Sequence, residues 1–188
     1  MTLEELWELF PIFLVEHDDR WEFYYDEIEK ELTRLLSDQH VVRISHIGST
    51  AVQEIWAKNI VDVMVEIPEN NSMKDVARIL GQNGFTIMSA EANRISLNKG
   101  YTENGFADKV YHIHLRYAGD NDELFFRDYL NDHTDVAKEY EALKLRLWKI
   151  TETLIQMQRQ ISSQNGLQKR KRNTETDTDK SKYIHITI

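Results

Sequence analysis

The residues with the clearest chemical potential lie in the run from Ile44 to Glu66. A predicted strand ends there at Gly48-Ser49, and a second predicted strand carries one carboxylate, Asp62. Backbone N–H groups of a glycine-containing turn suit phosphate, and a carboxylate suits a divalent cation. A second acid two residues after Asp62 would complete a pair for two metal ions, but that position is Met64. The run predicts a phosphate-binding turn that faces a single acid.

His112 and His114 are the best metal-binding or proton-transfer pair in the chain, because they share one face of a predicted strand. With Asp62 on a neighbouring strand, they form the candidate catalytic set, in which Asp62 and His114 are the candidate metal ligands. Alternatively, Asp62 forms a buried pair with Lys58 or Arg116, since a carboxylate among apolar strand residues is costly unless it is paired.

Five residues are candidates for binding a nucleotide phosphate: Gly48, Ser49, Thr50, Lys58 and Arg127. Ser49 would donate to an anion, but it has no evident base beside it and is not proposed as a nucleophile. Lys58 either neutralises phosphate or is a surface lysine. Arg127 either binds phosphate bidentately or forms an ion pair that anchors its helix.

Hydrophobic periodicity predicts alternating strands and helices followed by a helical C-terminal part. The predicted strands span 41–47, 60–67, 85–88, 94–98 and 109–117, and the predicted helices span 19–36, 73–82, 122–131 and 134 to about 163. The segment Thr176 to Ile186 fits either a short helix or a strand. This order predicts one α+β domain over residues 1–188 with a mixed β-sheet.

Three of the predicted strands have one apolar and one polar or mixed face. The second face carries Asp62, Met64, Glu66, Arg94, Ser96, Asn98, His112, His114 and Arg116. We expect helices to cover the apolar face and the polar face to stay open. That open face is either ordinary solvated surface or a functional cleft.

The composition narrows the class of protein. The chain has 188 residues, no cysteine and a formal net charge of −9. These features predict a cytoplasmic protein without a disulfide framework, and they make nucleic acid an unlikely partner. The basic run Lys169 to Arg172 is interpreted as a solvated connection rather than an RNA site. No apolar stretch reaches the roughly 18 residues of a membrane span, so we expect no membrane association.

Several short motifs, in this order, resemble the GrpB family, which has a nucleotidyltransferase-like fold. The matching segments are Asp19-Arg20-Trp21, the stretch from His46 to Asp62, Tyr111 to Leu115, Phe126 to Leu130, Tyr140 to Lys144 and Lys180 to Ile184. The resemblance covers about residues 15–188. The family has proline where this chain has Gln53 and Asn59, and we expect the fold to tolerate both changes.

The resemblance implies a polymerase-β-like nucleotidyltransferase core in which a glycine-serine turn positions nucleotide phosphates. It implies Mg²⁺ or Mn²⁺ at Asp62, or zinc if the histidines are ligands. The first hypothesis is an enzyme that transfers a nucleotidyl group to a small molecule. The alternative is a degenerate module that binds or senses a nucleotide or another phosphorylated metabolite. The apolar stripe of the long C-terminal helix packs on the sheet or forms a homodimer interface.

Overall fold

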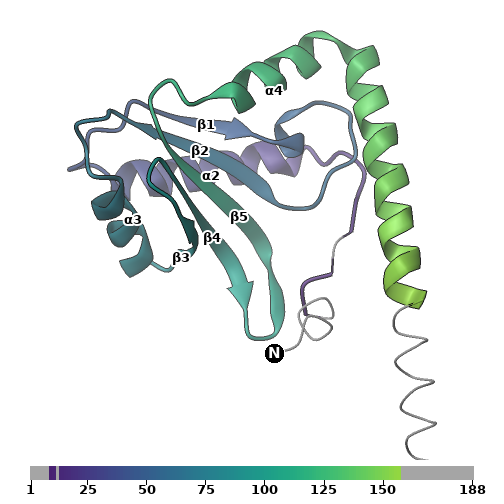
Figure 1. Cartoon of the computed structure of the whole chain (residues 1–188), viewed down its shortest axis with the longest axis horizontal. Coiled ribbons are helices and arrows are strands. Elements are labelled where there is room, and N and C mark those ends of the chain that lie inside the picture. The colour runs from purple at the N-terminus through teal and green to yellow at the C-terminus, as the bar shows by residue number, and fades with distance from the viewer. Residues whose placement is uncertain (1–8, 12, 158–188) are drawn as a thin grey trace, which may run out of the picture. The chain divides into compact units, whose positions relative to one another are not determined.

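The computed structural model describes residues 9–11 and 13–157 (Figure 1). It divides the chain into two compact units, Met1–Leu145 and Arg146–Ile188, and each is described by itself. The basic run 169–172, the segment 176–186 and the end of the predicted C-terminal helix lie outside the described residues. The single-domain arrangement stays a prediction.

The first unit is an α+β structure built on one five-stranded mixed sheet, as predicted. Its named elements are α2 (Arg20–Leu35), β1 (Arg43–Ile47), η1 (Ser49–Ala51), β2 (Val61–Ile67), α3 (Met73–Gln82), β3 (Thr86–Ala90), β4 (Arg94–Thr102), β5 (Gly105–Tyr117) and α4 (Asp122–Asp132). The strand order is β1-β2-β5-β4-β3. Only the central pair β2–β5 is parallel, and the other pairs are antiparallel.

The helices begin where local chemistry favours them. The Ser72 side chain accepts a hydrogen bond from the Asp75 backbone N–H at 3.3 Å, which satisfies one free donor of the first turn of α3. Gly84 follows that helix with φ +89°, a conformation that favours glycine. The predicted bounds of α3 are confirmed. Strands β4 and β5 run further toward their shared turn than predicted, because a register shift beside Gly100 interrupts the alternation there.

Helices α2 and α3 cover the apolar face of the sheet. Their buried residues, among them Trp21, Ile28 and Leu80, join the alternate strand residues Val63 and Ile113 in one core cluster. These five side chains are at most 1% exposed. Burial of apolar area at about 25 cal/mol per Å² makes this face the main source of stability.

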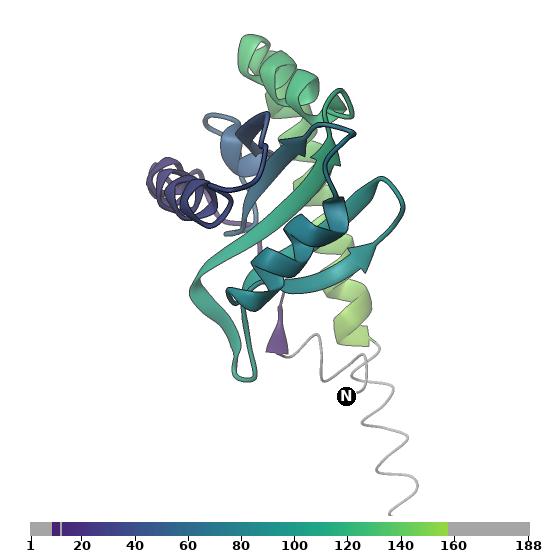
Figure 2. The ribbon, with the colours of Figure 1, turned by 90° about the vertical axis from the view of Figure 1, so that its left-hand side faces the viewer.

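The polar face is covered in part, so the expectation that it stays open was wrong for one end. Leu124 of α4 packs against Ile47 and Met64. Glu66 and Arg116 are only 2% and 5% exposed. Figure 2 shows α4 at the upper end of the ribbon, away from α3. Buried charges are tolerated there because they are paired: Glu66 accepts from Arg43 at 2.6 Å and from Asn121 at 3.1 Å.

Residues 134–145, at the end of the first unit, are helical. Ala137 is buried in a small cluster with Val52, Ile55 and Leu130, against which Tyr140 packs. The described part of the second unit, residues 146–157, is also helical. Its apolar residues Leu147, Ile150, Leu154 and Met157 are exposed. The homodimer stays a prediction. Among the described residues, no helix has the length and apolar character that crossing a membrane requires.

Candidate functional site

The parallel pairing of β2 with β5 places the predicted catalytic residues together. Asp62 lies directly opposite His112, and the next same-face pair is Met64 with His114. Asp62 Oδ1 is 3.0 Å from His114 Nε2 and 3.4 Å from His112 Nδ1. The alternative partners Lys58 and Arg116 were wrong. Arg116 instead donates to the Leu115 carbonyl at 3.1 Å and forms ion pairs with Asp120 and Glu123.

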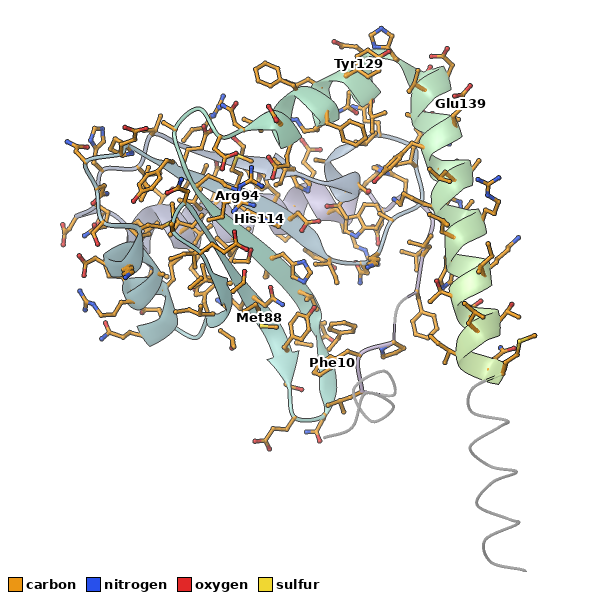
Figure 3. All side chains as sticks on the ribbon, in the orientation of Figure 1. Phe10, Met88, Arg94, His114, Tyr129 and Glu139 are labelled. Atoms are coloured by element: carbon orange, nitrogen blue, oxygen red, sulfur yellow. The ribbon has the colours of Figure 1, made fainter. Side chains whose placement is uncertain are left out.

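The two imidazoles determine the charge of the Asp62 carboxyl. Burial would raise the pKa of Asp62, but hydrogen bonds from His112 and His114 outweigh burial and lower the pKa to about 2. The carboxylate is therefore ionised at neutral pH. His114, labelled in Figure 3, lies in the C-terminal half of β5.

The predicted phosphate-binding turn lies against this carboxylate. Gly48 has φ +71° and ψ −170° and precedes the short helix η1. A Cβ on Gly48 would lie 2.5 Å from Asp62 Oδ2, so only glycine lets the turn approach the carboxylate this closely. Ser49 lines cavities on both sides of Asp62. The Thr50 hydroxyl instead lies 2.9 Å from His46 Nε2, which restricts its use for phosphate.

His46 supports the turn from within the protein. Its ring stacks on Tyr25, with centroids 4.9 Å apart. Burial lowers the pKa of His46 to about 4, against a smaller opposing effect of Asp62. The His46 ring is therefore neutral at physiological pH.

Two cavities meet at Asp62. The smaller, about 210 Å³, is lined by Ile47, Gly48, Ser49, Val52, Asp62, His114, Glu123, Phe126, Arg127, Leu130 and Tyr140. The larger, about 390 Å³, is lined by Leu14, Ser49, Thr50, Ala57, Lys58, Ile60, Asp62, His112, Tyr140 and Lys144. Ser49, Asp62 and Tyr140 belong to both linings. The larger cavity falls within the usual range of small-molecule sites.

The two predicted phosphate-binding cations fall in different cavities. Lys58 is exposed and lines the larger one. Arg127 lines the smaller one, and it also donates to the His46 carbonyl at 2.6 Å and pairs with Asp128. The contact with His46 ties α4 to β1 through a hydrogen bond, whereas the ion pair lies within α4 and does not anchor the helix as predicted. The phosphate-binding role of Arg127 stays a prediction.

The sequence analysis did not include Lys144, Tyr140 or Tyr101 among the candidate site residues. Lys144 donates to the Trp56 carbonyl at 2.7 Å, and its ammonium group is 5.2 Å from the centroid of the Tyr140 ring. The spacing of Tyr140 and Lys144, four residues apart on a helix, was the available signal for a shared face. Tyr101 contacts His112 only through a register shift, which no pattern in the sequence predicts.

The two candidate metal ligands lie together, with Asp62 Oδ1 3.0 Å from His114 Nε2. Among the residues that the structure describes, no group of three or more His, Cys, Asp or Glu side chains is arranged to hold a metal ion. Met64 is fully buried where a second acid would be needed. Mg²⁺ and Mn²⁺ tolerate such a site because one carboxylate, substrate phosphates and water can complete the shell. Zinc with histidine ligands stays the alternative prediction, because imidazole and carboxylate groups together also suit that ion.

Gln53 and Asn59, which stand where the family has proline, both form hydrogen bonds in this structure. The Gln53 backbone N–H donates to the Asn131 side chain at 3.0 Å, a bond that proline could not make. The Asn59 side chain accepts from the Trp21 indole at 2.7 Å. Both substitutions therefore add contacts that hold the loop between η1 and β2.

Together, the mixed sheet, the glycine turn and the Asp62–histidine cluster define an α+β protein with a polar cleft at the sheet. The family model described as GrpB protein matches residues 11–162. The chain belongs to the GrpB family.

Comparisons with individual proteins agree with this assignment. The chain is 30% identical over 151 residues to UPF0157 protein YqkA of Bacillus subtilis, a match that covers 77% of this chain and 43% of YqkA. It is 33% identical to glutamate-rich protein GrpB of Alkalihalophilus pseudofirmus, over 72% of this chain and 80% of that protein.

One solved structure also supports the fold. The crystal structure of conserved protein GrpB from Enterococcus faecalis matches with a TM-score of 0.62 and 24% identity, over 73% of this chain and 84% of that chain. A weaker match, with a TM-score of 0.49 and 14% identity over 70% of this chain and 41% of that chain, is to the Cid1 poly(U) polymerase bound to MgATP.

Proposed function

We propose that this chain acts on a nucleotide or another phosphorylated small molecule as a nucleotidyltransferase-like enzyme. The observation that carries the proposal is the meeting of two cavities at Asp62 and Ser49. A group held at that point can be reached by one ligand from each side, which is the requirement for transfer between two substrates.

The larger cavity supplies the positive charge for the phosphates. Lys58 and Lys144 both line it, together with the turn at Ser49. Burial, and to a smaller extent the charge of Lys58, lowers the pKa of Lys144 to about 8, against an opposing effect of Glu141. A bound phosphate would relieve this cost, because an anion between the two lysines stabilises their charged forms.

The smaller cavity suits the less charged part of a substrate. Phe126 and Tyr140 meet edge to face there, with ring centroids 5.4 Å apart. Leu130 adds a third apolar surface, and Arg127 adds a cation. This lining favours an aromatic or apolar group with an anion beside it.

Asp62 is the residue that would hold one Mg²⁺ or Mn²⁺, with substrate phosphates completing the shell. Such a cation, when bound, would neutralise phosphate charge. Ser49 would donate a hydrogen bond to a phosphate oxygen. His112 and His114 would orient the Asp62 carboxylate and transfer protons to or from the substrate.

A second candidate function is a binding or sensing module without turnover. It is favoured by Met64, which is fully buried at the position where a second acid would complete a metal pair. It is also favoured by the two imidazoles beside Asp62 Oδ1, because they occupy an oxygen that a catalytic metal ion would need. This candidate uses the same cleft and ligand class but predicts no reaction.

The test is a thermal-unfolding screen of the purified chain with nucleoside triphosphates, each with and without Mg²⁺ or Mn²⁺. A ligand at a hundred times its Kd adds about 2.7 kcal/mol to the free energy of unfolding. We expect a cation-dependent shift that Asp62→Asn abolishes. Asp132→Asn is the matched control, because Asp132 is exposed at the end of α4 and lines neither cavity.

An assay of pyrophosphate release, with the nucleotide that stabilises the chain, distinguishes the enzyme from the binding module. Turnover that is lost in Asp62→Asn supports the enzyme, whereas stabilisation without turnover supports the binding module. If no triphosphate shifts the unfolding transition of the native chain, the proposed nucleotidyl transfer is wrong.

A further inference from the structure

The environment of Tyr101 shows an arrangement that neither the fold nor the proposed reaction explains. Its hydroxyl oxygen is 2.9 Å from His112 Nε2, and the two rings stack with centroids 5.9 Å apart. The opposite ring nitrogen, His112 Nδ1, is 3.4 Å from Asp62 Oδ1. Asp62, His112 and Tyr101 therefore form a line of carboxylate, imidazole and phenol.

The backbone departs from regular strand geometry where Tyr101 joins this line. Asn98 of β4 pairs with His112, so strict alternation would place Tyr101 on the opposite face. The register shifts between Lys99 and Tyr101, and Gly100 has φ +93°. A Cβ on Gly100 would overlap the Lys109 carbonyl oxygen. A bulge of this kind redirects a side chain, and here it redirects Tyr101 toward His112.

Neighbouring aromatic rings fix the Tyr101 ring in this position. Phe10 lies 4.9 Å and Phe106 lies 5.0 Å from it, centroid to centroid. Burial and the charge of Asp62 both raise the pKa of Tyr101, so its phenol keeps its proton at neutral pH. The Tyr101 hydroxyl is therefore a fixed donor.

The direction of each hydrogen bond follows from the groups at the two ends. A carboxylate only accepts, so His112 Nδ1 carries a proton and donates to Asp62. In the neutral ring Nε2 is then the acceptor, and the Tyr101 O–H donates to it. The reverse tautomer would direct the Nδ1 lone pair at the carboxylate.

We propose that Tyr101 is a positioning residue that holds His112 in the Nδ1–H tautomer and so keeps one of the two imidazole donors directed at Asp62. Tyr101 lines neither of the two cavities at Asp62 and acts through His112 alone. The inference concerns the free protein and does not depend on the proposed function.

The test is ¹⁵N NMR of the histidine side chains in the free chain at about pH 8.5, well above the ordinary histidine pKa. Protonated and unprotonated ring nitrogens are well separated in such spectra. The signals that disappear in His112→Gln assign the ring. We expect native His112 to be protonated at Nδ1. In Tyr101→Phe we expect the ratio of Nδ1–H to Nε2–H forms to fall roughly 2- to 10-fold, the effect of one lost hydrogen bond.

Tyr111→Phe is the matched control. Tyr111 lies beside His112 on β5 but faces the opposite side of the sheet, and it is 6% exposed. It loses the same hydroxyl and should leave the His112 tautomer unchanged. Native His112 protonated at Nε2, or the same His112 spectrum in Tyr101→Phe as in the native chain, would overturn the proposal. A change of equal size in both variants would also overturn it.

Discussion

The two faces of the same strands serve different purposes. On one face, Val63 and Ile113 are fully buried and belong to the apolar core cluster together with residues of α2 and α3. On the other face, Asp62 and His112 are one position away along the same strands and border cavities. The alternation of a strand therefore lets one short segment stabilise the fold and carry reactive groups at once.

The polar face itself is divided. At the end beneath α4, Glu66 and Arg116 are buried and held by ion pairs with Arg43, Asp120 and Glu123. At the other end, the Asp62 side chain is 27% exposed. Similar polar side chains are thus structural where they are buried in ion pairs, and available to a ligand where they border a cavity. Burial, rather than residue type, separates the two roles.

The comparison of the two faces is tested most strongly by Leu80→Ala on α3. Leu80 is fully buried in the core of the apolar face. Its truncation should lower the free energy of unfolding by about 2–5 kcal/mol, the usual cost of a core cavity, as measured by urea denaturation. The affinity of the folded protein for a nucleotide should be unchanged. A loss of affinity comparable to that of Asp62→Asn would mean that the two faces are coupled.

The next effect is the pH dependence of stability from His46. Its folded pKa of about 4 lies below the ordinary value of 6.5, because burial disfavours the charged ring. Its contribution is complete above pH 6.5 and is lost as pH falls toward 4, in total about 3 kcal/mol. The test compares the free energy of unfolding near pH 7 with that near pH 4. The loss of stability that His46 causes on acidification should be absent in His46→Gln. Equal losses in both proteins would contradict the assignment.

Arg127→Gln distinguishes two roles of Arg127, which are attaching α4 to β1 and binding a phosphate. Loss of the charged hydrogen bond to the His46 carbonyl should lower the free energy of unfolding by about 1.5–3 kcal/mol. If Arg127 also contacts a phosphate, as proposed, nucleotide affinity measured by calorimetry should fall about tenfold or more. Unchanged affinity would leave Arg127 with the structural role alone. Arg78→Gln, an exposed change on α3, should alter stability by less than about 0.5 kcal/mol.

Among the variants at the candidate site, Gly48→Ala has the smallest expected effect on the free energy of unfolding. Alanine at φ +71° and ψ −170° is strained, which should cost about 1–3 kcal/mol in unfolding free energy. The added methyl group would also displace the Asp62 carboxylate, so the cation-dependent thermal shift should disappear. Gly81→Ala is the control, since a Cβ there meets nothing within 4 Å and a helical alanine should be slightly stabilising. Normal ligand binding by Gly48→Ala would show that the close approach of turn and acid is dispensable.

Much of the fold was predictable because its signals are local. The alternation over 60–67 and 109–117 identified which residues share a face, and the helical pattern over 73–82 identified α3. Strand ends were less predictable. Gly100 lies within β4 in an unusual conformation, and no rule of alternation anticipates that a strand continues through it.

The candidate site was predictable as a set of residue types but not as a set of partners. Asp62, His112 and His114 were recognised from their spacing, while the alternative partners Lys58 and Arg116 were wrong. Lys144 was missed because it reaches the larger cavity from a helix far along the chain. No periodicity within one element can identify such a contact.

By itself, the sequence determined which residues alternate on each strand, where glycine permits a turn, and which family the motifs resemble. Only the tertiary structure decided that β2 and β5 are parallel neighbours, that α4 closes one end of the polar face, and that Tyr101 reaches His112. The physical reason is that alternation and capping depend on neighbouring residues, whereas strand order and helix docking depend on burial summed over the whole chain.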